Sequence, residues 1–290
     1  MTSPDITRPA ITDLNLFKEV LTASCYNESA WQILDAYDVA KGVAAGGDKS
    51  LRSRVRRWIA RTAKKRGYAV VRQLPFDPAR RQGGEDWPLF GYTMVGHKRL
   101  DNIEFCLETV LADGIEGDVI ETGVWRGGAM MFAKALLDLR GATDRSVWCA
   151  DSFEGLPKQY GRDLEIADDP ELSGSSTLAV TQQAVEANFR RFDLLDDRVK
   201  FLKGWFSDTL PTAPVEKIAI ARLDGDLYES TMDALVNLYP KVSPGGFVII
   251  DDYGSWKGCR AAVDEYRDEH GIDAPIERID DHGYFWRVPK

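Results

Sequence analysis

Residues 117–141 read GDVIETGVWRGGAMMFAKALLDLRG. The short apolar run at the start of this stretch is typical of a buried strand, and the longer apolar run at its end is typical of a buried helix. The glycines between them let the backbone approach a ligand closely, and the helix that follows presents free N–H groups. The stretch therefore predicts a strand, a glycine turn and a helix, which is the unit from which parallel sheets are built.

The same alternation continues toward the carboxyl end of the chain. Four more strands are expected, within SVWCADSF (146–153), VKFLKGWF (199–206), KIAIARLDGD (217–226) and GGFVIIDDY (245–253). Helices are expected over 97–112, 128–141, 230–243 and 258–271 and near 179–192, with a closing hairpin around Asp281-His282-Gly283. Apolar strands that alternate with helices indicate a parallel sheet covered on both faces. We therefore predict a doubly wound, Rossmann-like α/β domain over residues 89–290, mostly parallel with a C-terminal antiparallel hairpin.

Residues 1–88 are predicted to form a helical extension or lid. Apolar residues at helical spacing favour helix in 1–45, capped by Thr12 or Asp13, and PFDPARRQGGEDWP (75–88) is typical of a loop. The segment 49–66, KSLRSRVRRWIARTAKKR, carries nine Lys and Arg and no acid. Its narrow apolar stripe could contact an anionic membrane surface or substrate, or could pack on the acidic main domain or on a second subunit.

Composition excludes several classes of protein. Of 290 residues, 44% are hydrophobic and 29% charged, which excludes disorder, collagen and coiled coil as the main architecture. No apolar run reaches the roughly 20 residues of a membrane span. The start of the sequence lacks a secretory signal and the four cysteines are scattered, so we expect a cytoplasmic protein with reduced thiols. The net charge of −9 argues against nucleic-acid binding.

Ligands of open α/β sheets bind beyond the carboxyl ends of the strands, so the residues there are the candidates. The first strand ends in Glu121, and glycines follow at Gly123 and Gly127, without the full dinucleotide fingerprint G-x-G-x-x-G. The second strand ends in Asp151, where an acid can accept hydrogen bonds from a ribose diol. Together they indicate a nucleoside-containing ligand, although structural glycines and a loop acid would give the same pattern.

Four carboxylates follow the two later strands: Asp224, Asp226, Asp251 and Asp252. The interval between the two pairs suits one crossover between neighbouring parallel strands, so all four should meet at one edge of the sheet. Carboxylates that close repel one another unless they are neutralised, and a hard cation such as Mg²⁺ would do so. Two solvated acidic turns, the D-x-D motif of a metal-dependent glycosyltransferase, and a non-catalytic membrane-associated module are the alternatives.

Six ordered motifs resemble the macrocin-type sugar O-methyltransferases of antibiotic biosynthesis. They are GYTMVGHKRLDNI (91–103), DVIETGVWRGGAMMFAKA (118–135), WCADSFEGLP (148–157), FLKGWFSDTLP (201–211), RLDGDLYESTMDAL (222–235) and SPGGFVIIDDY (243–253). The similarity covers about residues 85–290. It implies a class I methyltransferase fold, S-adenosylmethionine and Mg²⁺ as cofactors, and a sugar hydroxyl of a natural-product glycoside or saccharide as the acceptor. We also expect a homo-oligomer.

The resemblance also implies roles for individual residues. It places the methionine part of the cofactor at Glu121, Thr122, Gly123 and the glycine turn with Gly127, the ribose at Asp151 and Ser152, and the adenine near Gly204, Trp205 and Phe206. Thr93 and Met94 match a lid over the cofactor. Asp224, Asp251 and Asp252 match metal ligands, Asp224 also bordering the cofactor and sharing in catalysis, and Asp226 matches a general base that removes the proton of the sugar hydroxyl.

The chain departs from the family pattern in ways that bear on the acceptor. Tyr92 stands where relatives often carry His, and residues 152–200 contain no His, although some relatives have one there. The region 45–85 is also longer and more basic than the family pattern. His97 is an active-site candidate, whereas His270 and His282 are expected to be structural. The acceptor loops are therefore expected to differ from those of the relatives.

Overall fold

The computed structural model describes residues 11–25, 30–33, 71–85, 90–166 and 178–290, together with residue 88 and scattered residues between 55 and 68. Its main feature is a seven-stranded sheet in the order β5-β4-β3-β6-β7-β9-β8. The strands are β3 (Asp118–Thr122), β4 (Val147–Asp151), β5 (Val199–Lys203), β6 (Ile218–Leu223), β7 (Val242–Ile250), β8 (Glu277–Arg278) and β9 (Tyr284–Arg287). Strands β3 to β7 are parallel, and β9 pairs antiparallel with β7 and β8. The predicted doubly wound fold with a C-terminal hairpin is confirmed.

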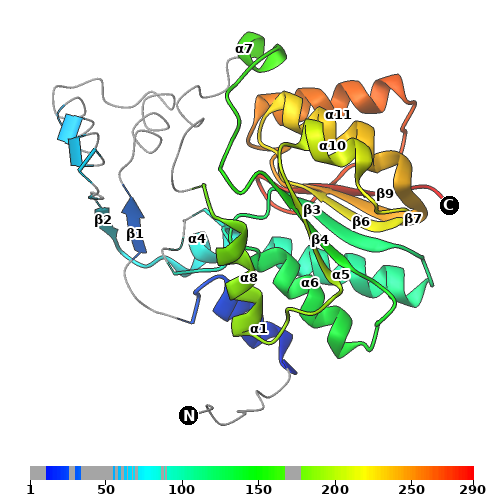
Figure 1. Cartoon of the computed structure of the whole chain (residues 1–290), viewed down its shortest axis with the longest axis horizontal. Helices are drawn as coiled ribbons and strands as arrows, with labels where there is room; N and C mark the ends of the chain where they lie inside the picture. The colour runs from blue at the N-terminus through cyan, green and yellow to red at the C-terminus, as the bar shows by residue number, and fades with distance from the viewer. Residues whose placement is uncertain are drawn as a thin grey trace.

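Helices cover both faces of this sheet (Figure 1). One face carries α1 (Leu14–Leu21), α5 (His97–Ala112), α6 (Gly128–Leu139) and α8 (Gln182–Arg191), and the other carries α10 (Tyr228–Leu238) and α11 (Lys257–Glu269). Successive side chains of a strand point to opposite faces. Val119 of β3 accordingly lies in the core beneath α5 and α6, and its neighbour Ile120 lies in the core beneath α10. Two apolar cores therefore hold the sheet rigid from both sides.

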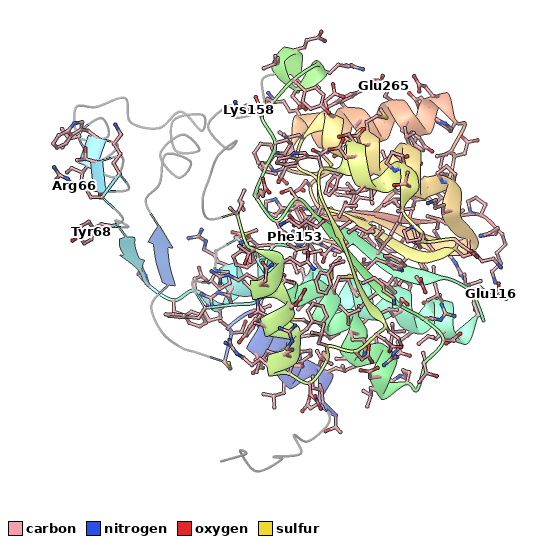
Figure 2. All side chains as sticks on the ribbon, in the orientation of Figure 1. Arg66, Tyr68, Glu116, Phe153, Lys158 and Glu265 are labelled. Atoms are coloured by element: carbon pink, nitrogen blue, oxygen red, sulfur yellow. The ribbon has the colours of Figure 1, made fainter. Side chains whose placement is uncertain are left out.

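The strand order reverses between β3 and β6, whose carboxyl ends lie side by side. Figure 2 shows the polarity of the strands, with Glu116 just before β3 and Phe153 just after β4 at opposite ends of the sheet. The loops after β3 and β6 touch at Gly123, where a Cβ atom would lie 2.0 Å from the carbonyl oxygen of Asp224. Gly123 also has φ +78°, so only glycine fits, and the loops that carry the candidate residues are packed against each other.

The extension before residue 90 is only partly helical. Helix α1 begins after Asp13, whose side chain accepts a hydrogen bond from the Leu16 N–H, as predicted for the cap. However, β1 (Ala30–Ile33) pairs antiparallel with β2 (Val71–Leu74), so the helix prediction for 1–45 is wrong there. The partner strand lies about forty residues away along the chain, and local periodicity carries no information about such a pairing. The rest of 1–45 outside 11–25 and 30–33 lies outside the described residues.

Three short helices interrupt segments that were expected to be something else. Helix α4 (Pro78–Gly83) forms within the predicted loop 75–88, because Asp77 caps it and Pro78 starts it. Helix α7 (Arg162–Ile166) forms within residues 155–176, which the sequence predicts as a polar loop, and α9 (Phe206–Thr209) begins at the last residue of the predicted third strand, which itself ends at Lys203. The single 3₁₀ turns η1 (Leu210–Thr212) and η2 (Tyr239–Lys241) precede β6 and β7.

The basic segment 49–66 lies largely outside the described residues. Its described members Val55, Trp58, Ile59, Thr62 and Ala63 are helical, and the first three are exposed. What this stripe contacts stays a prediction. Within the described part of the chain, no helix combines the length and the apolar character needed to cross a membrane.

Candidate functional site

Two adjoining cavities open at the carboxyl ends of the strands. The first, of about 500 Å³, lies against the ends of β4 and β5, and we call it the β4–β5 cavity. The second, of about 450 Å³, lies against the end of β7, and we call it the β7 cavity. The two share six lining residues: Met94, Gly123, Trp125, Leu178, Asp224 and Asp226. Any chemistry between ligands in the two cavities would take place at this shared wall.

Asp151 is the fixed point of the β4–β5 cavity. One carboxylate oxygen accepts hydrogen bonds from the Val124 N–H (2.8 Å) and the Trp125 N–H (3.3 Å), and the other accepts one from the Phe153 N–H (2.7 Å). Burial raises the pKa of Asp151, and these backbone donors counteract the rise. Trp125 and Phe153 have φ of +48° and +57°, which is strained for residues with a side chain. The carboxylate thus clamps the loops after β3 and β4 together.

The other residues predicted near a nucleoside line the same cavity. Ser152, Gly204, Trp205 and Phe206 all do, and the Gly204 N–H donates to the carbonyl oxygen of Asp151 at 2.9 Å. Three further lining residues come from the loop after β4 and were not among the predicted site residues: Leu156, Pro157 and Tyr160. A flat heterocycle suits such a slot, with a ribose placed at Asp151, so the residues present fit an adenosyl group.

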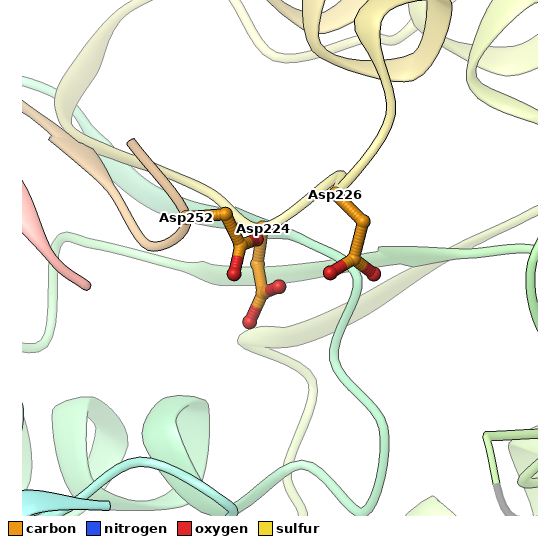
Figure 3. A group of neighbouring side chains, drawn as sticks. All are labelled: Asp224, Asp226 and Asp252. Atoms are coloured by element: carbon orange, nitrogen blue, oxygen red, sulfur yellow. The ribbon is translucent and has the colours of Figure 1, made fainter. Parts of the chain in front are cut away.

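Three carboxylates meet in the β7 cavity. Asp224, Asp226 and Asp252 each offer an oxygen, and these oxygens lie within 4.8 Å of one another (Figure 3). Asp224 and Asp226 follow β6 and Asp252 follows β7, so the two strand ends meet as the spacing predicted. Asp226 has φ +54°, a further strained residue at the shared wall.

The electrostatics of this group favour a bound cation. Burial raises the pKa of Asp252 well above its usual range, and Asp226, Asp224 and Asp251 raise it further. Burial and Asp251 raise the pKa of Asp224 to about 6. Among the described residues, one oxygen of Asp252 is buried without a hydrogen-bond partner. An orphaned oxygen among repelling carboxylates fits a hard cation with oxygen ligands, such as Mg²⁺.

Asp251 is not part of this group, although the predicted ligand set is Asp224, Asp251 and Asp252. One of its oxygens accepts a hydrogen bond from Arg222 and the other accepts one from Arg99 at 2.5 Å. Burial alone would raise the pKa of Asp251, but these two guanidinium groups lower it. Both aspartates line the β7 cavity, so spacing alone could not tell which of the two adjacent residues joins Asp224 and Asp226.

Glu121 sits at the floor of the β7 cavity. It is 2% exposed, and burial raises its pKa to about 8 despite an ion pair with Arg222. Its second oxygen has no hydrogen-bond partner among the described residues, which leaves an acceptor for a ligand amino group. Arg222 and Arg99 were missed in the sequence. The signal for Arg222 was present, because it is the single charged residue of the buried strand Ile218–Leu223.

The remaining predicted residues divide into two groups. Met94 lines both cavities and Thr93 lines the β7 cavity, and the lid role of the two residues stays a prediction. Thr122 and Gly127 line neither. The carbonyl oxygen of Thr122 accepts the Asp224 N–H at 3.0 Å, and Gly127, with φ +85°, is the N-cap of α6. Both residues therefore support the loops that line the cavities.

The histidine and tyrosine candidates lie elsewhere. His97 Nε2 lies within hydrogen-bond distance of the Thr22 hydroxyl (3.1 Å) and the Ser24 hydroxyl (3.2 Å), where α5 meets the segment after α1. The Tyr92 hydroxyl accepts a hydrogen bond from Arg191 at 2.8 Å. Neither residue lines the two cavities, whereas His282, expected to be structural only, lines the β7 cavity.

Known proteins share this arrangement. Residues 11–288 match the family model of macrocin O-methyltransferases. The chain is 58% identical over 206 residues to the 8-demethyl-8-(2,3-dimethoxy-alpha-L-rhamnosyl)-tetracenomycin-C 4'-O-methyltransferase of Streptomyces olivaceus. The matched region covers 70% of this chain and 78% of that protein. It is 48% identical over 221 residues to the mycinamicin III 3''-O-methyltransferase of Micromonospora griseorubida, covering 75% and 87%.

A solved structure agrees with these relatives. The O-methyltransferase NovP superposes with a TM-score of 0.76 at 39% identity, over 96% of this chain and 98% of that one. The sheet order, the two cavities and the family match together identify the fold as that of class I methyltransferases. The chain belongs to the macrocin O-methyltransferase family of enzymes.

Proposed function

We propose that the chain transfers a methyl group from S-adenosylmethionine to a hydroxyl of a sugar in a glycoside, with Mg²⁺ as a cofactor. The observation that carries this proposal is the pair of cavities that meet at Asp224 and Asp226. One cavity suits the methyl donor, and the other suits a hydroxyl-bearing acceptor. The reacting groups would then face each other across the shared wall.

The β4–β5 cavity is the proposed donor site. Asp151 would accept hydrogen bonds from the ribose hydroxyls, and Trp205 and Phe206 would contact the adenine. The methionine part would extend past the shared wall into the β7 cavity, where the unpartnered oxygen of Glu121 would accept a hydrogen bond from its amino group. Methyl transfer is an in-line displacement in which the S–CH₃ bond breaks as the O–CH₃ bond forms, so fixing both partners supplies much of the catalysis.

The carboxylates of the β7 cavity are the proposed cation site. Asp224 and Asp252 belong both to the geometric group and to the set that the resemblance implies. Asp226, which is in the group, and Asp251, which pairs with two arginines, compete for the third position. Mg²⁺ bound there would polarise the acceptor hydroxyl and lower its pKa.

Asp226 is the proposed general base. It lines both cavities, so its carboxylate can reach a hydroxyl group that faces the donor. The proton of the hydroxyl would pass to Asp226 as the methyl group arrives. Base and ligand roles are separated by one variant, because Asp226→Asn keeps the affinity for Mn²⁺ if the residue is a base alone and lowers it if the residue is a ligand.

A deoxysugar glycoside is the proposed acceptor. The relatives from Streptomyces and Micromonospora are named for a rhamnosyl-bearing tetracenomycin and for mycinamicin III. The β7 cavity offers an aromatic face and polar groups, as sugar rings require: Trp256, Arg80, Glu85, Asp281 and His282. A cytoplasmic location and a homo-oligomer remain predictions from the sequence.

The experiment incubates the purified chain with S-adenosylmethionine and a panel of rhamnosyl glycosides, with Mg²⁺ or with EDTA. A methylated product detected by mass spectrometry only with Mg²⁺ is the expected result. Product formed equally in EDTA would remove the cation from the proposal. Calorimetric titration with S-adenosylhomocysteine and with nucleotide sugars tests the D-x-D glycosyltransferase alternative. Binding of S-adenosylhomocysteine alone would exclude that alternative, and binding of a nucleotide sugar alone would favour it.

A further inference from the structure

A single buried guanidinium group binds three carboxylates of the β7 cavity, one of which, Asp224, also lines the β4–β5 cavity. Arg222 is 1% exposed, and its Nη1 atom donates both to Glu121 and to Asp224, the latter at 3.0 Å. Its Nη2 atom donates to Asp251. One side chain therefore holds carboxylates that follow or end three adjacent strands, β3, β6 and β7.

The sheet register makes this arrangement possible. Glu121 of β3 and Arg222 of β6 are direct partners in the parallel pairing, so their side chains leave the sheet side by side. A guanidinium group presents its donors in a rigid planar fork, and it can serve several carboxylates at once. A lysine ammonium at the same position is a single point and cannot reproduce that geometry.

We infer that Arg222 is a positioning residue that couples the proposed donor site to the proposed cation site, because one of its nitrogen atoms serves both Glu121 and Asp224. The inference rests on the proposed function. A cation at Asp224 satisfies that carboxylate, so that Nη1 is left to hold Glu121. Glu121 is then fixed for the donor, and the donor binds more tightly. By linkage, the donor strengthens cation binding by the same factor.

The test measures the Kd of S-adenosylhomocysteine by calorimetry with and without saturating Mn²⁺. The homocysteine form lacks the positive sulfur, so direct repulsion between ligand and cation does not mask the coupling. For the unaltered chain we expect at least about five-fold tighter binding with Mn²⁺, in the usual range of coupling between sites. For Arg222→Lys we expect the two Kd values to agree within about two-fold, since the shared contact is lost.

A matched control makes the same substitution at the opposite end of β3. Arg145 is also buried, and it donates to the carbonyl oxygens of Ile115 (2.5 Å) and Gly117 (3.1 Å), just before the strand begins. Arg145→Lys should keep the Mn²⁺ effect on S-adenosylhomocysteine, whatever its cost in stability. Glu121→Gln, a near-isosteric change at the other partner, should abolish the effect and covers the case in which Arg222→Lys does not fold.

Two results would overturn the inference while leaving the proposed function intact. One is an unaltered chain that binds both Mn²⁺ and S-adenosylhomocysteine but shows no coupling between them. The other is coupling that persists in both Arg222→Lys and Glu121→Gln. If the unaltered chain binds neither ligand, the proposed function is wrong, and this inference, which rests on it, is wrong as well.

Discussion

Two buried carboxylates at the carboxyl ends of different strands have opposite surroundings. Asp151, the last residue of β4, accepts hydrogen bonds from three backbone N–H groups, and so its charge is stabilised by the fold itself. Asp252, after β7, keeps an oxygen without a partner among the described residues, and its carboxylate neighbours raise its pKa further than burial alone. The first has its hydrogen bonds within the folded chain, whereas the second keeps one acceptor that the described residues leave open.

The difference shows how the site divides its work. Backbone donors fix a group whose task is to hold a ligand in place, since they cannot move independently of the sheet. Repelling carboxylates cost stability, and such strain persists at a site where a ligand relieves it. The structure therefore predicts that changes on the two sides separate into effects on donor binding and effects on cation binding or catalysis.

The largest expected effect lies at the wall shared by the cavities. Asp226→Asn should lower kcat by about 10²–10⁴-fold, the usual range for loss of a general base, and should leave the Kd of S-adenosylhomocysteine within about two-fold. Steady-state kinetics with the glycoside acceptor measure kcat, and calorimetry measures the Kd of S-adenosylhomocysteine. Asp264→Asn, on α11 outside both cavities, is the control. Full turnover in Asp226→Asn would remove this residue from catalysis.

Adjacent aspartates after β7 sharpen the comparison. Asp252→Asn should weaken Mn²⁺ binding by about 10–100-fold or more and should stabilise the metal-free protein, because a buried unpaired charge disappears. Asp251→Asn should destabilise it, by as much as about 3–5 kcal/mol, because Arg99 and Arg222 lose their shared carboxylate charge. Urea denaturation of the two metal-free variants measures the change in the free energy of unfolding and therefore its sign in each variant. Equal destabilisation by the two variants would contradict the division described above.

A smaller effect is expected on the donor side. Asp151→Asn should weaken binding of S-adenosylhomocysteine by about ten-fold and lower the free energy of unfolding by about 1–3 kcal/mol, since an amide nitrogen cannot accept the backbone hydrogen bonds. The affinity for Mn²⁺ should stay within about two-fold. Calorimetric titration with each ligand separates the two outcomes, and an equal loss of both affinities would show that the halves are not separable.

The smallest effect concerns pH. Burial raises the pKa of Glu121 to about 8 from an ordinary value near 4.5, so the folded state holds this proton where the unfolded state has lost it. The stability of the metal-free protein should therefore fall as the pH rises from about 5 to 8, and its Tm should fall with it. Glu121→Gln should flatten that slope in thermal unfolding curves. A slope unchanged in this variant would assign the dependence to other groups.

The sequence was sufficient for the main sheet and for the cap of α1. Continuous apolar runs marked β3 to β7, and GDVIETGVWRGG marked the loop that brings Gly123 against Asp224. It was insufficient for β1, because a strand that pairs with residues 71–74 depends on a partner that local periodicity does not show. The polar loops likewise concealed α4 and α7, whose few residues are too short for a periodic pattern.

The acids of the site were identifiable from the sequence, because strand order places the ends of β6 and β7 side by side whatever their side chains do. Their division into roles was a matter of tertiary structure. Asp251 accepts hydrogen bonds from two arginines, while Asp252 lies with Asp224 and Asp226, and spacing alone does not distinguish two adjacent residues that line the same cavity. The sequence thus determined which charges meet at the sheet edge, and three-dimensional packing alone decided which of them are paired with arginines and which keep an oxygen without a partner among the described residues.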